Sequence, residues 1–131
     1  MAERMVYYKT AAKYGEVEQT IEKSRFIGYI KPVQNREEAE AFIAEIRALH
    51  RSATHNVPAY VIGEKSEMQW ASDDKEPSRT AGAPILHLLN GEGITNVAVV
   101  VTRYFGGIKL GTGGLARAYG GTARLALDAA G

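Results

Sequence analysis

Residues 103–114, RYFGGIKLGTGG, combine the residue types that bind anions. Five glycines, two basic residues and two aromatic residues directly follow the valine-rich run VAVVVT. A glycine-rich turn that opens a helix exposes backbone N–H groups at the positive end of the helix dipole, and such groups bind anions. We therefore expect Gly111, Gly113 and Gly114, with Lys109 nearby, to hold a phosphate. The alternative is that these glycines only provide positive φ angles and close backbone packing.

Two common nucleotide-binding motifs do not fit this segment. A Walker A loop has a lysine directly after its last glycine, whereas Thr112 follows Gly111 here. Residues 111–116 match the G-x-G-x-x-A spacing of dinucleotide-binding folds, but those folds need a second strand that ends in Asp or Glu about 20 residues later. At that distance this chain is still in its last predicted helix. A phosphate in this segment would thus be held by the backbone and by nearby cations.

Basic residues extend from this segment along the last predicted helix. Residues 101–131 have four basic and one acidic residue, a balance of +3, whereas residues 1–100 have 12 basic and 14 acidic residues. Arg117, Gly121 and Arg124 share one helical face, and the small glycine leaves room for a phosphate backbone. Alternatively, the arginines are ordinary solvated residues. The predicted anion- and nucleic-acid-binding residues are Arg103, Tyr104, Lys109, Gly111, Gly113, Gly114, Arg117 and Arg124, with Tyr104 stacking on a base if it is exposed.

A second group of residues has the types needed for acid–base or metal chemistry. His55 and Asn56 precede a predicted strand, and Asp73, Asp74 and Glu76 lie in the polar loop SDDKEPSR. Carboxylates bind hard cations such as Mg²⁺, and histidine titrates near neutral pH. The spacing fits hydrogen-bonding and capping roles equally well, so we expect a functional polar patch not far from Arg103 and assign no catalytic residue, metal or cofactor. The three histidines, His50, His55 and His87, form no metal-ligand pattern.

Hydrophobic patterns indicate the elements that position these residues. Asn35 stands three residues before Glu38, the spacing of a capping box, and Ala39, Phe42 and Ile46 share one face of the helix that follows. Residues 94–103 are apolar without alternation, as in a central strand covered on both faces. The order ββαββαβα predicts an α+β fold. The predicted elements are two strands in 16–33, a helix in 35–51, strands in 57–63 and 68–72, a helix in 83–90, a strand in 94–103 and a helix in 114–130.

The composition indicates one soluble cytoplasmic domain over residues 1–131. The chain is 45% hydrophobic and 24% charged, which suits a globular domain with its own core. It has no cysteine, which excludes disulfides and thiolate metal sites and favours a reducing compartment. No stretch has the apolar length of a signal-peptide core or a membrane span, so no membrane partner is expected.

Four segments resemble the signature blocks of a known family. KSRFIGYI, ATHNVPAY, SDDKEPSRTAGAP and VVVTRYFGGIKLGTGGLARAY follow one another in the order found in the IMPACT/YigZ family, and the resemblance covers about residues 16–130. It implies a two-layer α+β sandwich like domain IV of the translocation factor EF-G, with a four-stranded sheet and helices on one face. It also implies that two-domain members continue into a ferredoxin-like C-terminal domain, which we expect this chain, ending at Gly131, to lack.

The resemblance also suggests a role in translation. Eukaryotic members of the family are associated with translational control in amino-acid starvation, and bacterial members are proposed to bind nucleic acid or ribosomes. We therefore expect a cytoplasmic domain that binds RNA or the ribosome and is connected to translation regulation and stress. Two alternatives remain open: a phosphate-ligand or nucleotide-binding enzyme that uses the glycine-rich loop, and a regulatory module that contacts a protein partner.

Overall fold

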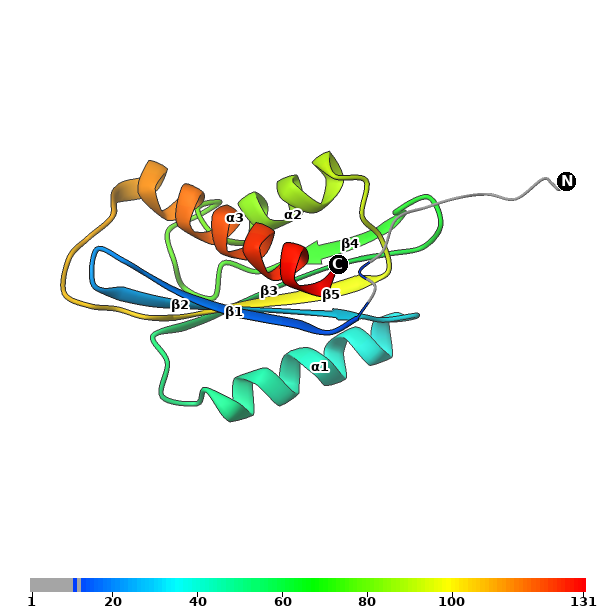
Figure 1. Ribbon diagram of the computed structural model, residues 1–131, viewed down its shortest axis with the longest axis horizontal. Helices are drawn as coiled ribbons and strands as arrows, with labels where there is room; N and C mark the ends of the chain where they lie inside the picture. Colours follow the sequence, from blue (N-terminus) through cyan, green and yellow to red (C-terminus); the bar gives the residue numbers. More distant parts are fainter. Residues whose placement is uncertain (1–10, 12) are drawn as a thin grey trace, which may run out of the picture.

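Over the described residues, 11 and 13–131, the computed structural model has five strands and three helices in the predicted order (Figure 1). The elements are β1 (Gly15–Ile21), β2 (Ser24–Pro32), α1 (Arg36–Leu49), β3 (His55–Ile62), β4 (Met68–Ala71), α2 (Gly82–Gly91), β5 (Val97–Tyr104) and α3 (Gly111–Ala130). The strands form one sheet in the order β1-β2-β5-β3-β4, and every neighbouring pair is antiparallel. The predicted α+β class is confirmed.

Helices cover both faces of the sheet, with α1 below it and α2 and α3 above it in Figure 1. Along β5, Val99 and Val101 pack into the apolar layer of α2 and α3, while Ala98 and Val100 pack into the layer of α1. A strand that is apolar at each position needs cover on both sides. The expectation of four strands with helices on one face is therefore corrected to five strands with helices on both.

Helix α3 lies unusually close to the first hairpin. A Cβ atom built on Gly28 of β2 would lie 2.9 Å from the Thr122 carbonyl oxygen, and one built on Gly15 of β1 would lie 2.6 Å from the Ala126 carbonyl oxygen. Strand glycines of this kind mark a close approach of another backbone. This contact sets the rotation of α3, so that Arg117, at a position turned away from the sheet, faces solvent.

Candidate functional site

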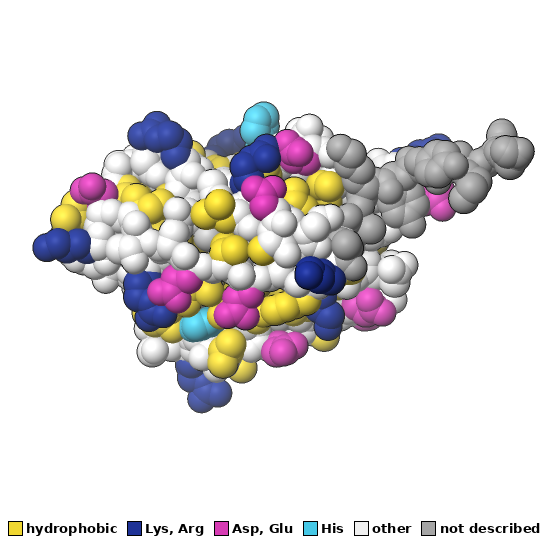
Figure 2. Space-filling model, in the orientation of Figure 1, with side chains coloured by type: hydrophobic (Ala, Val, Ile, Leu, Met, Phe, Trp, Pro, Cys, Tyr) yellow, Lys and Arg dark blue, Asp and Glu magenta, His cyan; other side chains and the backbone are white. Residues whose placement is uncertain are grey.

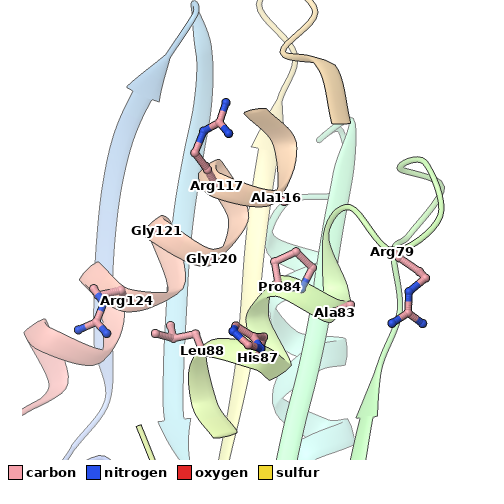
Figure 3. Close-up of a pocket in the computed structure, with 10 residues that line it drawn as sticks. All are labelled: Arg79, Ala83, Pro84, His87, Leu88, Ala116, Arg117, Gly120, Gly121 and Arg124. Carbon is pink, nitrogen blue, oxygen red and sulfur yellow. The ribbon is translucent and has the colours of Figure 1, made fainter. Parts of the chain in front are cut away.

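A groove of about 620 Å³ lies between α2 and α3 (Figure 3). Gly120 and Gly121 of α3 and Pro84 of α2 line it, and a Cβ on Gly120 would lie at an ordinary contact distance, 3.6 Å, from the Pro84 carbonyl oxygen. In Figure 3 two arginines extend from α3 on one side, His87 projects from α2, and a third arginine lies on the far side in the loop before α2. The basic and titratable side chains that line the groove are Arg79, His87, Arg117 and Arg124.

The arginines of the groove differ in their partners. Arg124 Nη2 lies 2.6 Å from Glu92 Oε2, and both side chains are partly exposed. Among the described residues, Arg79 and Arg117 form no ion pair. On the face in Figure 2, basic side chains and a histidine gather over α2 and α3, with acidic side chains among them. The groove thus offers two exposed guanidinium groups that form no close ion pair within the described residues, although the Arg79 charge acts on Asp73, and a third guanidinium in a solvent-exposed pair.

The start of α3 lies within the segment predicted to bind an anion. Gly111, the first residue of the helix, has a φ of +76°, a conformation that glycine adopts without strain. The N-cap residue Leu110 makes no side-chain hydrogen bond to the first turn, which also contains Gly113 and Gly114. Lys109 is exposed directly before this turn. The structure thus contains both features that the sequence left open, a glycine with a positive φ angle and a helix start without a side-chain cap, and anion binding stays a prediction.

A buried polar cluster lies where β3, β5 and α3 meet the loop after β4. Glu76 Oε2 accepts a hydrogen bond from Arg103 Nη1 at 2.8 Å and another from the Tyr119 hydroxyl. Arg103 also donates from Nε and Nη2 to the Ser24 hydroxyl oxygen, at 3.3 and 3.2 Å. His55 Nε2 lies 3.4 Å from Glu76 Oε1. Burial, and then the Glu76 carboxylate, raise the pKa of Tyr119, so its hydroxyl remains a donor.

The structure brings His55 to the acidic loop, as the sequence predicted. His55 Nδ1 lies 2.8 Å from the Asp74 carbonyl oxygen, and it must be the donor because a carbonyl only accepts. The Asp74 carboxylate accepts the Asn56 backbone N–H at 2.7 Å, and the Asn56 side-chain oxygen accepts the Thr102 hydroxyl at 2.7 Å. These bonds orient His55 so that Nε2 faces Glu76. The functional role of this patch stays a prediction.

Asp73, also expected in the polar patch, caps the start of α2. Its Oδ1 accepts the backbone N–H groups of Ala81 and Gly82 at 3.2 and 3.0 Å, and its Oδ2 accepts that of Arg79 at 2.9 Å. Burial alone would raise the pKa of Asp73, but these three hydrogen bonds and the Arg79 charge together lower it. Asp73 therefore holds the loop that carries Arg79 into the groove.

Tyr104 lies on the opposite face of the sheet from the arginines of α3. Its ring packs against the apolar layer of α1, and its hydroxyl lies 2.6 Å from His50 Nδ1, while the Tyr29 hydroxyl lies 2.5 Å from His50 Nε2. Burial, and then the charge of Arg25, lower the pKa of His50, which favours a neutral ring with one donating and one accepting nitrogen. The expectation that Tyr104 and the α3 arginines form one binding surface is therefore wrong, because the sheet lies between them.

The role expected for Arg103 is corrected as well: it is not an exposed phosphate contact but the buried ion-pair partner of Glu76. Its residue exposure is 4%, and its guanidinium lies 5.5 Å from the ring centre of Phe26 and 5.3 Å from that of Phe105. Phe105, with 46% exposure, is the accessible aromatic residue of this segment. Side chains alternate along a strand, so Arg103 and Phe105 share one face and Tyr104 takes the other. That alternation could have identified Phe105 from the sequence.

Three further residues of these sites were missed by sequence reasoning. Arg79 lies in the loop SDDKEPSR, and its proximity to α3 follows from the packing of α2 beside that helix. His87 is an exposed position of an otherwise apolar helix, which could have marked it. Tyr119 reads as a core residue in the sequence, and only its hydroxyl bond to Glu76 reveals a polar role.

Within residues 11 and 13–131, no group of three or more His, Asp or Glu side chains could hold a metal ion. In the same part of the chain, no helix is long and apolar enough to cross a membrane.

Known proteins share this fold and sequence. Residues 22–127 match the family model described as the Impact N-terminal domain. The chain is 54% identical over 113 residues to the IMPACT family member YvyE of Bacillus subtilis, covering 86% of this chain and 52% of that protein. A crystal structure of a hypothetical protein matches with a TM-score of 0.90 and 42% identity, covering 95% of this chain and 62% of the other.

A more distant likeness comes from a protein described as the two-domain translational regulator Yih1. It matches with a TM-score of 0.53 and 26% identity, covering all of this chain and 50% of the Yih1 chain. The chain thus spans about half the length of the bacterial and Yih1 relatives it matches. The resemblance inferred from the four signature blocks is confirmed. With the family model matching most of its residues, the chain belongs to the IMPACT family.

Proposed function

We propose that this domain binds the phosphates of RNA, free or in the ribosome, through the groove between α2 and α3, and that it takes part in the control of translation. The observation that supports this most directly is the set of side chains around the groove. Arginines from α3 and from the loop before α2 lie on both sides of a floor that includes glycine backbone. Exposed guanidinium groups are well suited to phosphates because they donate several hydrogen bonds in one plane.

The spacing along α3 suits a polyanion. Arg117 and Arg124 are seven residues apart, which at 1.5 Å per residue separates them by about 10 Å along the helix axis. Phosphates of one strand of duplex DNA repeat about every 3.4 Å along its axis, so two arginines at this spacing would contact different phosphates. The Arg124–Glu92 pair is solvent-exposed, and such pairs contribute little to stability. A phosphate could therefore replace Glu92 at little cost, and Lys109 would extend the basic surface.

The family supports the connection to translation. Yih1, with 26% identity over the whole chain, is described as a translational regulator. RNA and ribosomes would require the cytoplasmic location that the absence of cysteine favours. The proposal concerns this domain alone, because the relatives are about twice its length.

Salt-dependent RNA binding tests the proposal. Binding of fluorescently labelled single-stranded RNA would be followed by anisotropy in a salt series from about 50 to 200 mM. For a single strand, log K falls by about 0.7 per unit of log salt for each phosphate contact, so Arg117→Ala with Arg124→Ala should lower the slope by about 1.4. We expect affinity at low salt to fall as well, with unchanged circular dichroism.

A matched control removes the same charge from the other side of the sheet. Arg36 and Arg47 are exposed on α1, so Arg36→Ala with Arg47→Ala changes the net charge equally and leaves the groove intact. This control should keep the wild-type slope. If both double variants lower the slope equally, only net charge matters and the groove is not the site. If wild type does not bind RNA at low salt, the proposal is wrong and a protein partner becomes the better candidate.

A further inference from the structure

A second cavity, of about 410 Å³, lies at the end of the molecule where β5 leads into α3, on the left in Figure 1. It shares no lining residue with the α2–α3 groove. Its apolar walls are formed by Pro77, Phe105, Leu110 and Leu115, and its polar atoms come from two groups of residues. This volume is in the range of small-molecule sites, about 300–1,000 Å³, which combine apolar walls with a few polar groups.

One polar group is the buried cluster around Glu76. The Glu76 and Arg103 side chains are 4% and 5% exposed, and their charges cancel across the 2.8 Å contact. Glu76 Oε2 is occupied by Arg103 and Tyr119, while among the described residues Oε1 contacts only His55 Nε2, at 3.4 Å.

His55 leaves an acceptor at this wall. Because His55 Nδ1 donates to the Asp74 carbonyl, Nε2 is the ring nitrogen that faces Glu76, and in a neutral ring it has a lone pair. The Glu76 carboxylate oxygen beside it also only accepts. In the neutral form the two acceptors face each other across 3.4 Å without a proton between them. A hydroxyl group entering from the cavity would donate to one of them, and an amino group to both.

The other polar group carries positive charge. Lys109 lines the cavity together with Gly111 and Thr112 of the first turn of α3. Among the described residues, Lys109 forms no ion pair, although Glu22 lines the neighbouring hollow with it. Since Arg103 is neutralised by Glu76, Lys109 gives this cavity a net positive charge, to which the uncapped helix end adds.

We propose that this cavity binds a small organic anion with an apolar body. The phosphate or carboxylate group lies at Lys109, the apolar body contacts Phe105 and Leu115, and a hydrogen-bond donor at the far end reaches His55 Nε2 and Glu76 Oε1. This cavity and the α2–α3 groove have no lining residue in common, so neither site depends on the other. Lys109 belongs to this cavity and only extends the basic surface beside the groove.

NMR titration of the 131-residue chain with simple probes tests the charge requirement. Phenyl phosphate and benzoate, which distinguish the two kinds of anion, should shift the backbone amides of Gly111 and Thr112 saturably, and uncharged benzyl alcohol should bind at least tenfold more weakly. Lys109→Met should weaken the anions about tenfold, the loss expected for one charge-assisted hydrogen bond. Lys65→Met, a matched change at an exposed loop residue away from the cavity, should have no effect.

The donor requirement has its own comparison. 4-Hydroxybenzoate should bind more tightly than benzoate, and His55→Phe should remove that difference. In the Arg117→Ala with Arg124→Ala variant, benzoate binding should be unchanged, so failure here and failure of the RNA proposal are distinguishable. Equal binding of benzoate and benzyl alcohol, or shifts confined to the amides of the α2–α3 groove, would overturn the assignment. No advantage for 4-hydroxybenzoate in wild type would exclude the role of His55 even if the variant does not fold.

Discussion

Replacing Glu76 with glutamine should strongly destabilise the fold. The change keeps the shape of the side chain and an oxygen that accepts the Tyr119 hydroxyl, but it removes the negative charge beside Arg103. Arg103 would then keep only neutral partners: the amide oxygen, the Ser24 hydroxyl and two aromatic rings. A buried cation without a counterion is among the costliest defects in a protein interior.

The distance and burial set the size of the effect. For N and O atoms 2.8 Å apart, the Coulomb attraction at an effective dielectric constant of 20 is about 6 kcal/mol. Part of that attraction only offsets the desolvation of the two groups, and breaking one side of a buried pair typically costs about 3–5 kcal/mol. We expect Glu76→Gln to lower the free energy of unfolding by that amount, measured by urea denaturation followed by far-UV circular dichroism.

A second pair in the same chain provides the control. Arg25 and Glu18 lie 2.7 Å apart, about as close as Arg103 and Glu76, but their side chains are 50% and 47% exposed. Glu18→Gln should therefore cost far less stability than Glu76→Gln, because exposed ion pairs contribute little. The two substitutions make the same chemical change in pairs with nearly equal N–O distances. The difference between their losses of unfolding free energy therefore measures the effect of burial.

A double variant separates charge from packing. Glu76→Gln combined with Arg103→Met removes both charges. The double variant should therefore lose less unfolding free energy than the two single variants together, by about 2 kcal/mol or more, since residues of one ion-pair network couple by up to about 3 kcal/mol. Strict additivity, or a loss for Glu76→Gln no larger than that for Glu18→Gln, would refute the reasoning.

Two further predictions concern the elements that position the groove. Asp73→Asn should cost about 1 kcal/mol at pH 7, as loss of a helix cap does. The folded-state pKa of Asp73 is lowered, so the stabilisation by its carboxylate is present above about pH 3.9 and is lost as the pH falls through the folded value. The urea midpoints of variant and wild type should therefore converge in acid. A constant difference between the two midpoints would contradict this. Gly28→Ala should cost about 1–3 kcal/mol, measured by thermal denaturation, because its Cβ would lie 2.9 Å from the Thr122 carbonyl oxygen; an unchanged Tm would show that α3 can move away.

Local hydrogen-bonding signals were the most reliable guide to the fold. The spacing of Asn35 and Glu38 predicted the start of α1, and the structure shows the Glu38 backbone N–H donating to Asn35 Oδ1 at 2.8 Å. The first turn of α3 was less predictable. The helix begins at Gly111, three residues earlier than expected, because glycine has a low helix propensity and no capping residue marks the start.

The candidate site was only partly predictable, for a related reason. Arg117 and Arg124 were found because a helical face follows from spacing within one element. The Glu76–Arg103 pair joins a loop to a strand 27 positions away, and no local pattern encodes such a contact. The groove likewise depends on how α2 packs beside α3, so Arg79 and His87 could not be grouped with the α3 arginines from sequence periodicity.

Burial, rather than residue type, separates the arginines of this segment into buried ones that need a partner and exposed ones that do not. The sequence pattern does not distinguish Arg103, Arg117 and Arg124, since all three follow the valine-rich run in a segment of positive charge. Arg103 sits at an inward position of the last stretch of β5, where desolvation makes a carboxylate partner obligatory, and Glu76 provides it. Arg117 sits on the outer face of α3, where water solvates the guanidinium and no partner is needed. A phosphate can therefore bind Arg117 without breaking a protein contact, whereas binding Arg103 would require opening the core.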